Sequence, residues 1–66
     1  MKHGLPIRHL GDNMYSVCME LSSGYIFFEN ESDRIDAHEG QTYQIISANL
    51  SLNIDSGRFY KLLTIN

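Results

Sequence analysis

The sequence predicts an all-β or β-rich fold, namely a small five-stranded antiparallel barrel or curled sheet with one short helix or acidic loop between strands 3 and 4. Three observations support this prediction. Apolar and polar residues alternate with a period of two along most of the chain, as in half-buried strands. Clusters of Gly, Asp, Asn and Ser separate the alternating segments, as hairpin turns do. Only residues 30–40 interrupt the alternation.

The size and composition of the chain limit the possible classes. Its 66 residues make one small domain over residues 1–66, because domains usually need about 100–200 residues. Apolar residues make up 42% of the chain, which is a folding composition. The net charge of −3 argues against a strongly basic nucleic-acid binder, and no apolar stretch resembles a membrane span or signal peptide. The single cysteine, Cys18, indicates a reducing compartment, so we expect a cytoplasmic protein.

The first half of the chain contains three strand candidates. Residues 5–10 are the weakest, because Pro6 favours a sheet edge or the start of a strand. Residues 25–28 are aromatic-rich and apolar on both faces, as expected of a buried strand. Residues 14–21 alternate, and the residues that share their apolar face are Tyr15, Val17, Met19 and Leu21.

The interruption is compatible with a helix over residues 32–39 or with an acidic loop. Ser32 is a candidate N-cap, and Gly40 would stand just beyond the helix C-terminus. In the helical interpretation, Ile35 is the main anchor to the core.

The second half contains two further strand candidates, residues 46–54 and 58–65. Residues 46–54 alternate without exception, whereas Tyr43 and Ile45 upstream carry apolar character on the opposite parity. This change of parity predicts a β-bulge or a bent strand, and a turn near Ala48-Asn49 is the lesser alternative.

Residues 41–54 contain no charge and no proline. Exposed edge strands are usually protected by such residues. We therefore expect this segment either to be paired internally or to pair with a second copy in a homodimer.

The order of three strands, a helix and two strands is that of an OB-type barrel, and an SH3-like barrel fits almost as well. This order, together with the chain length, is similar to bacterial translation initiation factor one, a minimal OB domain. The resemblance implies RNA binding, but the basic residues that such a factor needs are missing here.

Residues 29–39 hold five acidic residues against Arg34 alone, a local charge of −4. The predicted function is a non-catalytic module that binds a larger protein with a basic surface through this patch, with Tyr25 or Phe28 as an apolar anchor. The alternative without a partner is that residues 29–39 form a solvent-exposed helix or loop whose charges keep the protein soluble. The acidic set is Glu29, Glu31, Asp33, Asp36 and Glu39.

Two alternative functions remain open. An OB-like nucleic-acid-binding domain is less favoured, since backbone binding needs several cations. The residues that would serve it are Arg8, Tyr15, Phe27, Arg58 and Lys61. A homo-oligomeric structural subunit would instead protect the uncharged segment 41–54.

No pattern for catalysis, a cofactor or a metal is present, so we expect no enzyme and no cofactor. The three histidines, His3, His9 and His38, lack metal-ligand spacing, and one cysteine cannot complete a zinc site. The compact, acidic character is similar to the small inhibitors of phages and mobile elements, including anti-CRISPR proteins. This resemblance is one of style and covers no alignable motif.

Overall fold

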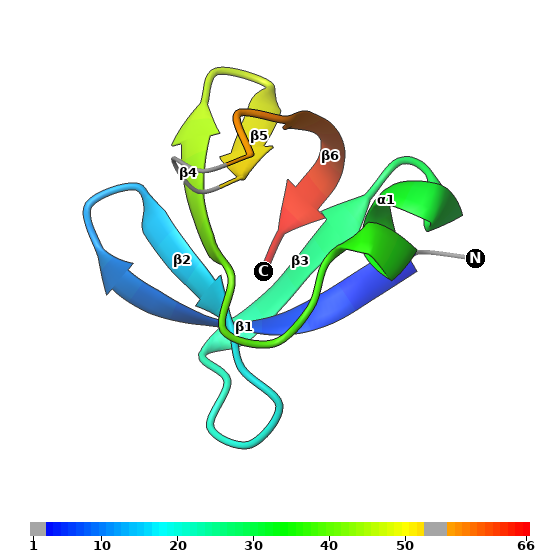
Figure 1. Cartoon of the computed structure of the whole chain (residues 1–66). Coiled ribbons are helices and arrows are strands. Elements are labelled where there is room, and N and C mark those ends of the chain that lie inside the picture. Colours follow the sequence, from blue (N-terminus) through cyan, green and yellow to red (C-terminus); the bar gives the residue numbers. More distant parts are fainter. Residues whose placement is uncertain (1–2, 53–55) are drawn as a thin grey trace.

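The computed structural model describes residues 3–52 and 56–66 and shows a closed barrel of six antiparallel strands with one short helix (Figure 1). The elements are β1 (His3–Gly11), β2 (Met14–Val17), β3 (Gly24–Phe28), α1 (Glu31–Asp36), β4 (Thr42–Ile46), β5 (Asn49–Leu52) and β6 (Phe59–Ile65). Around the barrel the strands follow the order β1-β2-β4-β5-β6-β3, and β3 pairs with β1 to close it. The predicted small antiparallel barrel, with a helix between the third and fourth strands, is confirmed.

The additional strand arises because residues 46–54 do not form one strand. Ile46 pairs with Asn49 across a two-residue turn, which makes β4 and β5 a hairpin. Tyr43 in β4 and Leu50 in β5 both point into the barrel, so the turn explains the change of parity. The prediction of a single bulged strand was wrong, and the lesser alternative of a turn near Ala48-Asn49 is confirmed.

The hairpin is paired on both sides. β4 pairs with β2 and β5 pairs with β6, in addition to their mutual pairing. Internal pairing, the first of the two expected arrangements, is therefore observed. Asn53 and Ile54 of the predicted strand, and Asp55 of the predicted turn, lie outside the described residues.

β1 accommodates Pro6 by changing partners along its length. It pairs with β3 over residues 3–7 and with β2 over residues 7–11. Pro6 lies in the half of β1 that pairs with β3 and not with β2. On its side toward β2 there is no strand pairing, so the missing backbone N–H is tolerated there. Pro6 instead offers its carbonyl oxygen, which accepts a hydrogen bond from the Cys18 N–H at 3.1 Å.

The core consists of the inward side chains of all six strands together with Ala37 beyond the helix. Phe28, Tyr43 and Tyr60 supply its aromatic part, with edge-to-face contacts of Tyr60 to both other rings. A register shift between β3 and β6 lets Leu62 and Ile65 both pack on the core while Leu63 is exposed. The remaining buried apolar residues are Leu5, Ile7, Val17, Ile26, Leu50 and Leu52.

The helix is shorter than the predicted 32–39 and presents a different face to the core. Asn30 is at the N-cap position and Ala37 at the C-cap position, where we expected Ser32 and Gly40 to mark the two ends. Asp33 is buried whereas Ile35 is 66% exposed. The prediction that Ile35 anchors the helix was wrong, because the inward position is taken by an ion-paired aspartate.

The turn between β4 and β5 predicts a stabilising substitution. Ser47 has a φ of 57°, a conformation that costs an L-residue about 1 kcal/mol and glycine almost nothing. We expect Ser47→Gly to raise the free energy of unfolding by about 0.5–1 kcal/mol. Thermal unfolding followed by circular dichroism measures the change.

Ala48→Gly is the matched control, because Ala48 is not among the described positive-φ residues. There glycine adds only unfolded-state entropy, so this variant should lose stability. Equal effects of the two substitutions would contradict the assigned turn.

Candidate functional site

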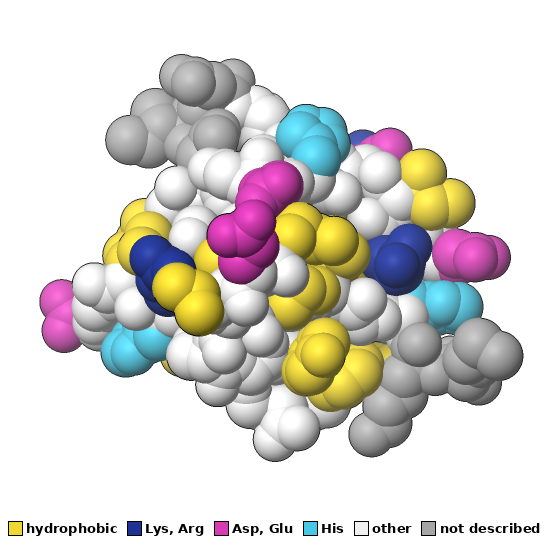
Figure 2. Space-filling view, turned by 90° about the horizontal axis from the view of Figure 1, so that it is seen from below, with side chains coloured by type: hydrophobic (Ala, Val, Ile, Leu, Met, Phe, Trp, Pro, Cys, Tyr) yellow, Lys and Arg dark blue, Asp and Glu magenta, His cyan; other side chains and the backbone are white. Residues whose placement is uncertain are grey.

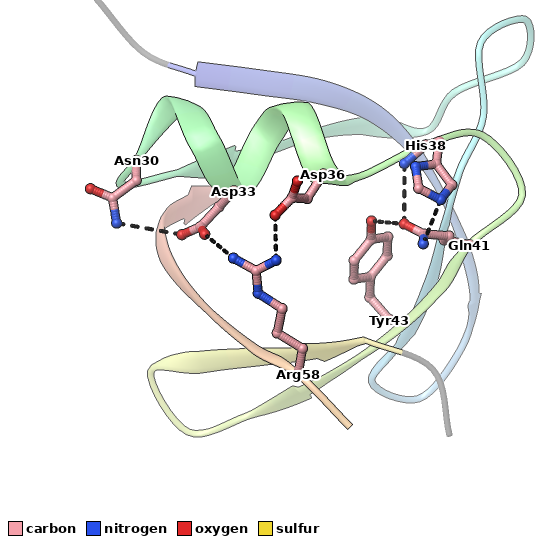
Figure 3. A network of polar contacts seen from close by, with 7 residues as sticks. All are labelled: Asn30, Asp33, Asp36, His38, Gln41, Tyr43 and Arg58. Atoms are coloured by element: carbon pink, nitrogen blue, oxygen red, sulfur yellow. Dashed lines mark hydrogen bonds and ion pairs between the residues drawn. The ribbon is translucent and has the colours of Figure 1, made fainter. Parts of the chain in front are cut away.

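Three of the five acidic residues predicted to contact a partner pair instead with two of the cations proposed for nucleic acid. Arg58, just before β6, reaches across to α1 and forms ion pairs with Asp33 at 3.4 Å and with Asp36 (Figure 3). Asn30 also donates to Asp33 at 3.4 Å. The two aspartates therefore hold the helix to the start of β6.

A second ion pair uses the next members of the two sets. Lys61 Nζ lies 3.4 Å from a carboxylate oxygen of Glu29, and both side chains are largely exposed. Glu31 and Glu39 are exposed and form no ion pair within the described part of the chain. The acidic set thus offers two carboxylates, not five, for an external contact.

Arg58 also covers an aromatic ring of the core. Its guanidinium carbon lies 4.9 Å from the centre of the Tyr60 ring, in cation–π contact. The hydrogen bond to Asp36 raises the pKa of Arg58, and burial raises the pKa of the Tyr60 phenol. Arg58 consequently links the helix, β6 and the core, which is a structural role.

A polar network lies beside Tyr43 (Figure 3). Gln41 Oε1 accepts hydrogen bonds from the Tyr43 hydroxyl at 2.8 Å and from the His38 backbone N–H at 3.1 Å. Gln41 Nε2 then lies 2.9 Å from His38 Nε2. Since an amide nitrogen only donates, the network requires the His38 ring to accept at Nε2.

The predicted aromatic contacts separate into buried and exposed residues. Phe28 has no exposed surface, so in the folded chain it serves the core and not a partner. Tyr15 packs against the core and on the His9 ring, with 4.8 Å between ring centres. Tyr25 is 48% exposed and stacks with half-buried Phe27 on the outer face of β3.

Met19 and Leu21, which the sequence pattern placed on the apolar face of a strand, lie exposed in the loop of residues 18–23. β2 ends at Val17, so Met19 and Leu21 are not strand residues and are 61% and 72% exposed. In Figure 1 this loop projects below the barrel, and Figure 2 shows hydrophobic side chains exposed on the face seen from below. The cluster Ser22-Ser23-Gly24 signals a turn here, but alternation gave no sign that the strand ends earlier.

Backbone contacts hold this loop against β1. Ser23 donates its N–H to the Ile7 carbonyl at 2.6 Å, and its hydroxyl oxygen accepts the His9 N–H at 2.9 Å. Arg8 Nε donates to the Leu21 carbonyl at 3.4 Å. The loop is therefore an ordered projection with Met19 and Leu21 on its surface.

The thiol of Cys18 belongs to the same loop. Its sulfur accepts the Leu21 N–H at 3.4 Å, and hydrogen bonds from the Leu21 and Glu20 backbone lower the pKa of this thiol. This contact folds the loop back on itself beside Leu21.

No group of three or more metal-ligating side chains comes together among residues 3–52 and 56–66. Within the same residues, no helix has the length and apolar character needed to cross a membrane. Compared with known proteins, the chain matches no protein-family model, no curated protein and no solved structure.

The burial of Asp33 predicts that replacing it lowers the stability of the fold more than replacing Asp36 does. Only 12% of the Asp33 side chain is exposed, against 44% of Asp36. We expect Asp33→Ala to lower the free energy of unfolding by about 1–3 kcal/mol, because the substitution removes the nearly buried acceptor of two donors, Asn30 and Arg58. Asp36→Ala should lose less than about 1 kcal/mol. Urea unfolding measures both values, and a larger loss for Asp36→Ala would contradict the assigned roles.

The burial of Tyr43 predicts a loss of stability at alkaline pH. Burial raises the pKa of its phenol above the ordinary 10.0. Above pH 10 the unfolded chain therefore releases a proton that the folded chain keeps, so stability falls as pH rises, by about 1.4 kcal/mol per pH unit for each such group. Urea unfolding between pH 9 and 11 measures the slope, and Tyr43→Phe should make it shallower. An unchanged slope in this variant would exclude Tyr43 as the cause.

Proposed function

We propose that the chain is a non-catalytic interaction module that binds a larger protein, as small inhibitors or regulators of the phage and mobile-element type do. The observation that carries the proposal is the ordered loop 18–23, which exposes Met19 and Leu21. Exposed apolar side chains next to each other are a common mark of protein contact surfaces. A loop already held in place loses less conformational entropy on binding.

Tyr25 is a further exposed residue close to this loop in the chain. It is the second residue of β3, two positions after the loop, and is 48% exposed. Tyrosine is enriched among the residues that dominate binding energy at interfaces. The proposed contact surface is therefore Met19, Leu21 and Tyr25, and it replaces Phe28 as the apolar anchor.

The acidic contact predicted from the sequence becomes a minor part of the proposal. Asp33, Asp36 and Glu29 already have cationic partners within the chain. Glu31 and Glu39 remain for a basic region of the partner. Exposed charge pairs contribute about 0–1 kcal/mol each, so the apolar loop should dominate the affinity.

The test is affinity capture of the tagged full chain from a lysate of its source, with and without nuclease, followed by calorimetry on the purified partner. Met19→Ser combined with Leu21→Ser should raise the Kd about 100-fold, because each buried apolar side chain contributes about 1.5 kcal/mol or more. Ile35→Ser is the matched control, because Ile35 is equally exposed on α1 and lies outside the loop. It should leave the Kd unchanged.

Two results would contradict this surface. If Glu31→Lys with Glu39→Lys abolishes binding while the loop variant binds normally, the acidic residues carry the contact. If the captured partners disappear after nuclease treatment, the nucleic-acid alternative is the better description.

A further inference from the structure

The outer face of β1 and β3 carries two aromatic rings, and two arginines lie beside them, Arg8 in β1 and Arg34 in α1, where Arg34 bonds to the Gly4 carbonyl of β1. Pro6 lies opposite Tyr25 and Gly4 lies opposite Phe27 in the register of these strands. Because Leu5, Ile7, Ile26 and Phe28 point inward, the alternating residues of both strands point outward. We call Arg8, Tyr25, Phe27 and Arg34 the arginine–aromatic face.

The two rings form one continuous surface along β3. Their centres are 6.2 Å apart and their planes are inclined by 29°. Phe27 lies over Gly4, where a Cβ atom would be 2.7 Å from its ring. The glycine therefore lets the ring lie close to the β1 backbone.

The two arginines lie at the two ends of this surface, and each is held by a hydrogen bond from its Nε to a backbone carbonyl. Arg8 Nε donates to the Leu21 carbonyl at 3.4 Å, and Arg34 Nε donates to the Gly4 carbonyl at 3.2 Å. Neither forms an ion pair with any carboxylate of the described residues. An arginine held through Nε still offers its terminal nitrogens to an anion.

The spacing of these groups defines what they can bind. Gly4 and Arg8 are four residues apart in one strand, which is about 13 Å. We propose, on the basis of the proposed function, that the arginine–aromatic face binds an extended acidic segment of the partner protein. This segment carries a bulky apolar side chain between two carboxylates about four residues apart.

The charge of the chain favours carboxylates over a nucleic-acid backbone. With a net charge of −3 the protein repels a polyanion at long range. Two arginines would displace only about two counterions from a single strand, a salt slope near −1.4. A protein segment with two carboxylates gains the same contacts without the dense charge of the backbone.

The probe is a phage-displayed library of random 12-residue peptides selected on the immobilised full chain. We expect selected peptides to contain two Asp or Glu residues about four positions apart with an aromatic or large aliphatic residue between them. Fluorescence anisotropy with a synthetic labelled peptide then gives the Kd. Arg8→Gln and Arg34→Gln should each weaken binding about fivefold. Tyr25→Ser should weaken it about tenfold or more.

Lys61→Gln is the matched control, because it removes the same charge from β6 and should leave the Kd unchanged. Replacing Glu by Gln in the peptide should have no further effect on the Arg8→Gln, Arg34→Gln double variant. Circular dichroism confirms that each variant is folded.

Three outcomes would overturn the inference. The first is selection of neutral or basic peptides. The second is a Kd of the arginine variants for the peptide that equals the wild-type Kd. The third is binding of a labelled (dT)12 that is tighter than binding of the peptide and depends on Arg8 and Arg34. The proposed function fails separately, since it depends on Met19 and Leu21. A captured partner that requires the loop but not the arginines would sustain that function and refute this inference.

Discussion

Closure of the barrel is the constraint on which the rest of the structure depends. β3 pairs with β1 on one side and with β6 on the other, so both of its edges are hydrogen-bonded to strands of the same barrel. A closed sheet has a single interior, and here three aromatic rings, Phe28, Tyr43 and Tyr60, fill much of it. Since the strands of residues 3–52 and 56–66 close on one another, the outer faces and the loops are the parts of these residues left for a contact with another molecule.

The distribution of charge follows from the same closure. Closing the barrel brings the start of β6 next to α1, so Arg58 meets two aspartates that lie 22 and 25 residues away in the sequence. An acidic segment that looked like a contact surface is thereby partly neutralised within the chain. Arg8 and Arg34, which are far apart in the sequence, form no ion pair with the described carboxylates and lie at either end of the Tyr25–Phe27 surface.

The sequence was informative where local pattern decides structure and uninformative where distant contacts do. Alternation and turn residues predicted a small barrel and placed the helix correctly between the third and fourth strands. Hydrophobicity misled at Ile35, because the helix turns Asp33 toward the core, where it pairs with Arg58, and leaves Ile35 exposed. It misled again at Met19 and Leu21, because nothing local shows that β2 ends at Val17.

The exposed loop and the arginine–aromatic face share one physical property, which is that their geometry is set before any partner binds. Ser23 and Arg8 fix the loop through contacts with β1, and backbone carbonyls fix both arginines through their Nε atoms. An immobilised side chain costs about 0.5–1.5 kcal/mol of binding free energy when a partner has to order it. A chain of 66 residues has little surface area for a contact, so side chains that the fold already orders would lower the entropy cost of the proposed binding.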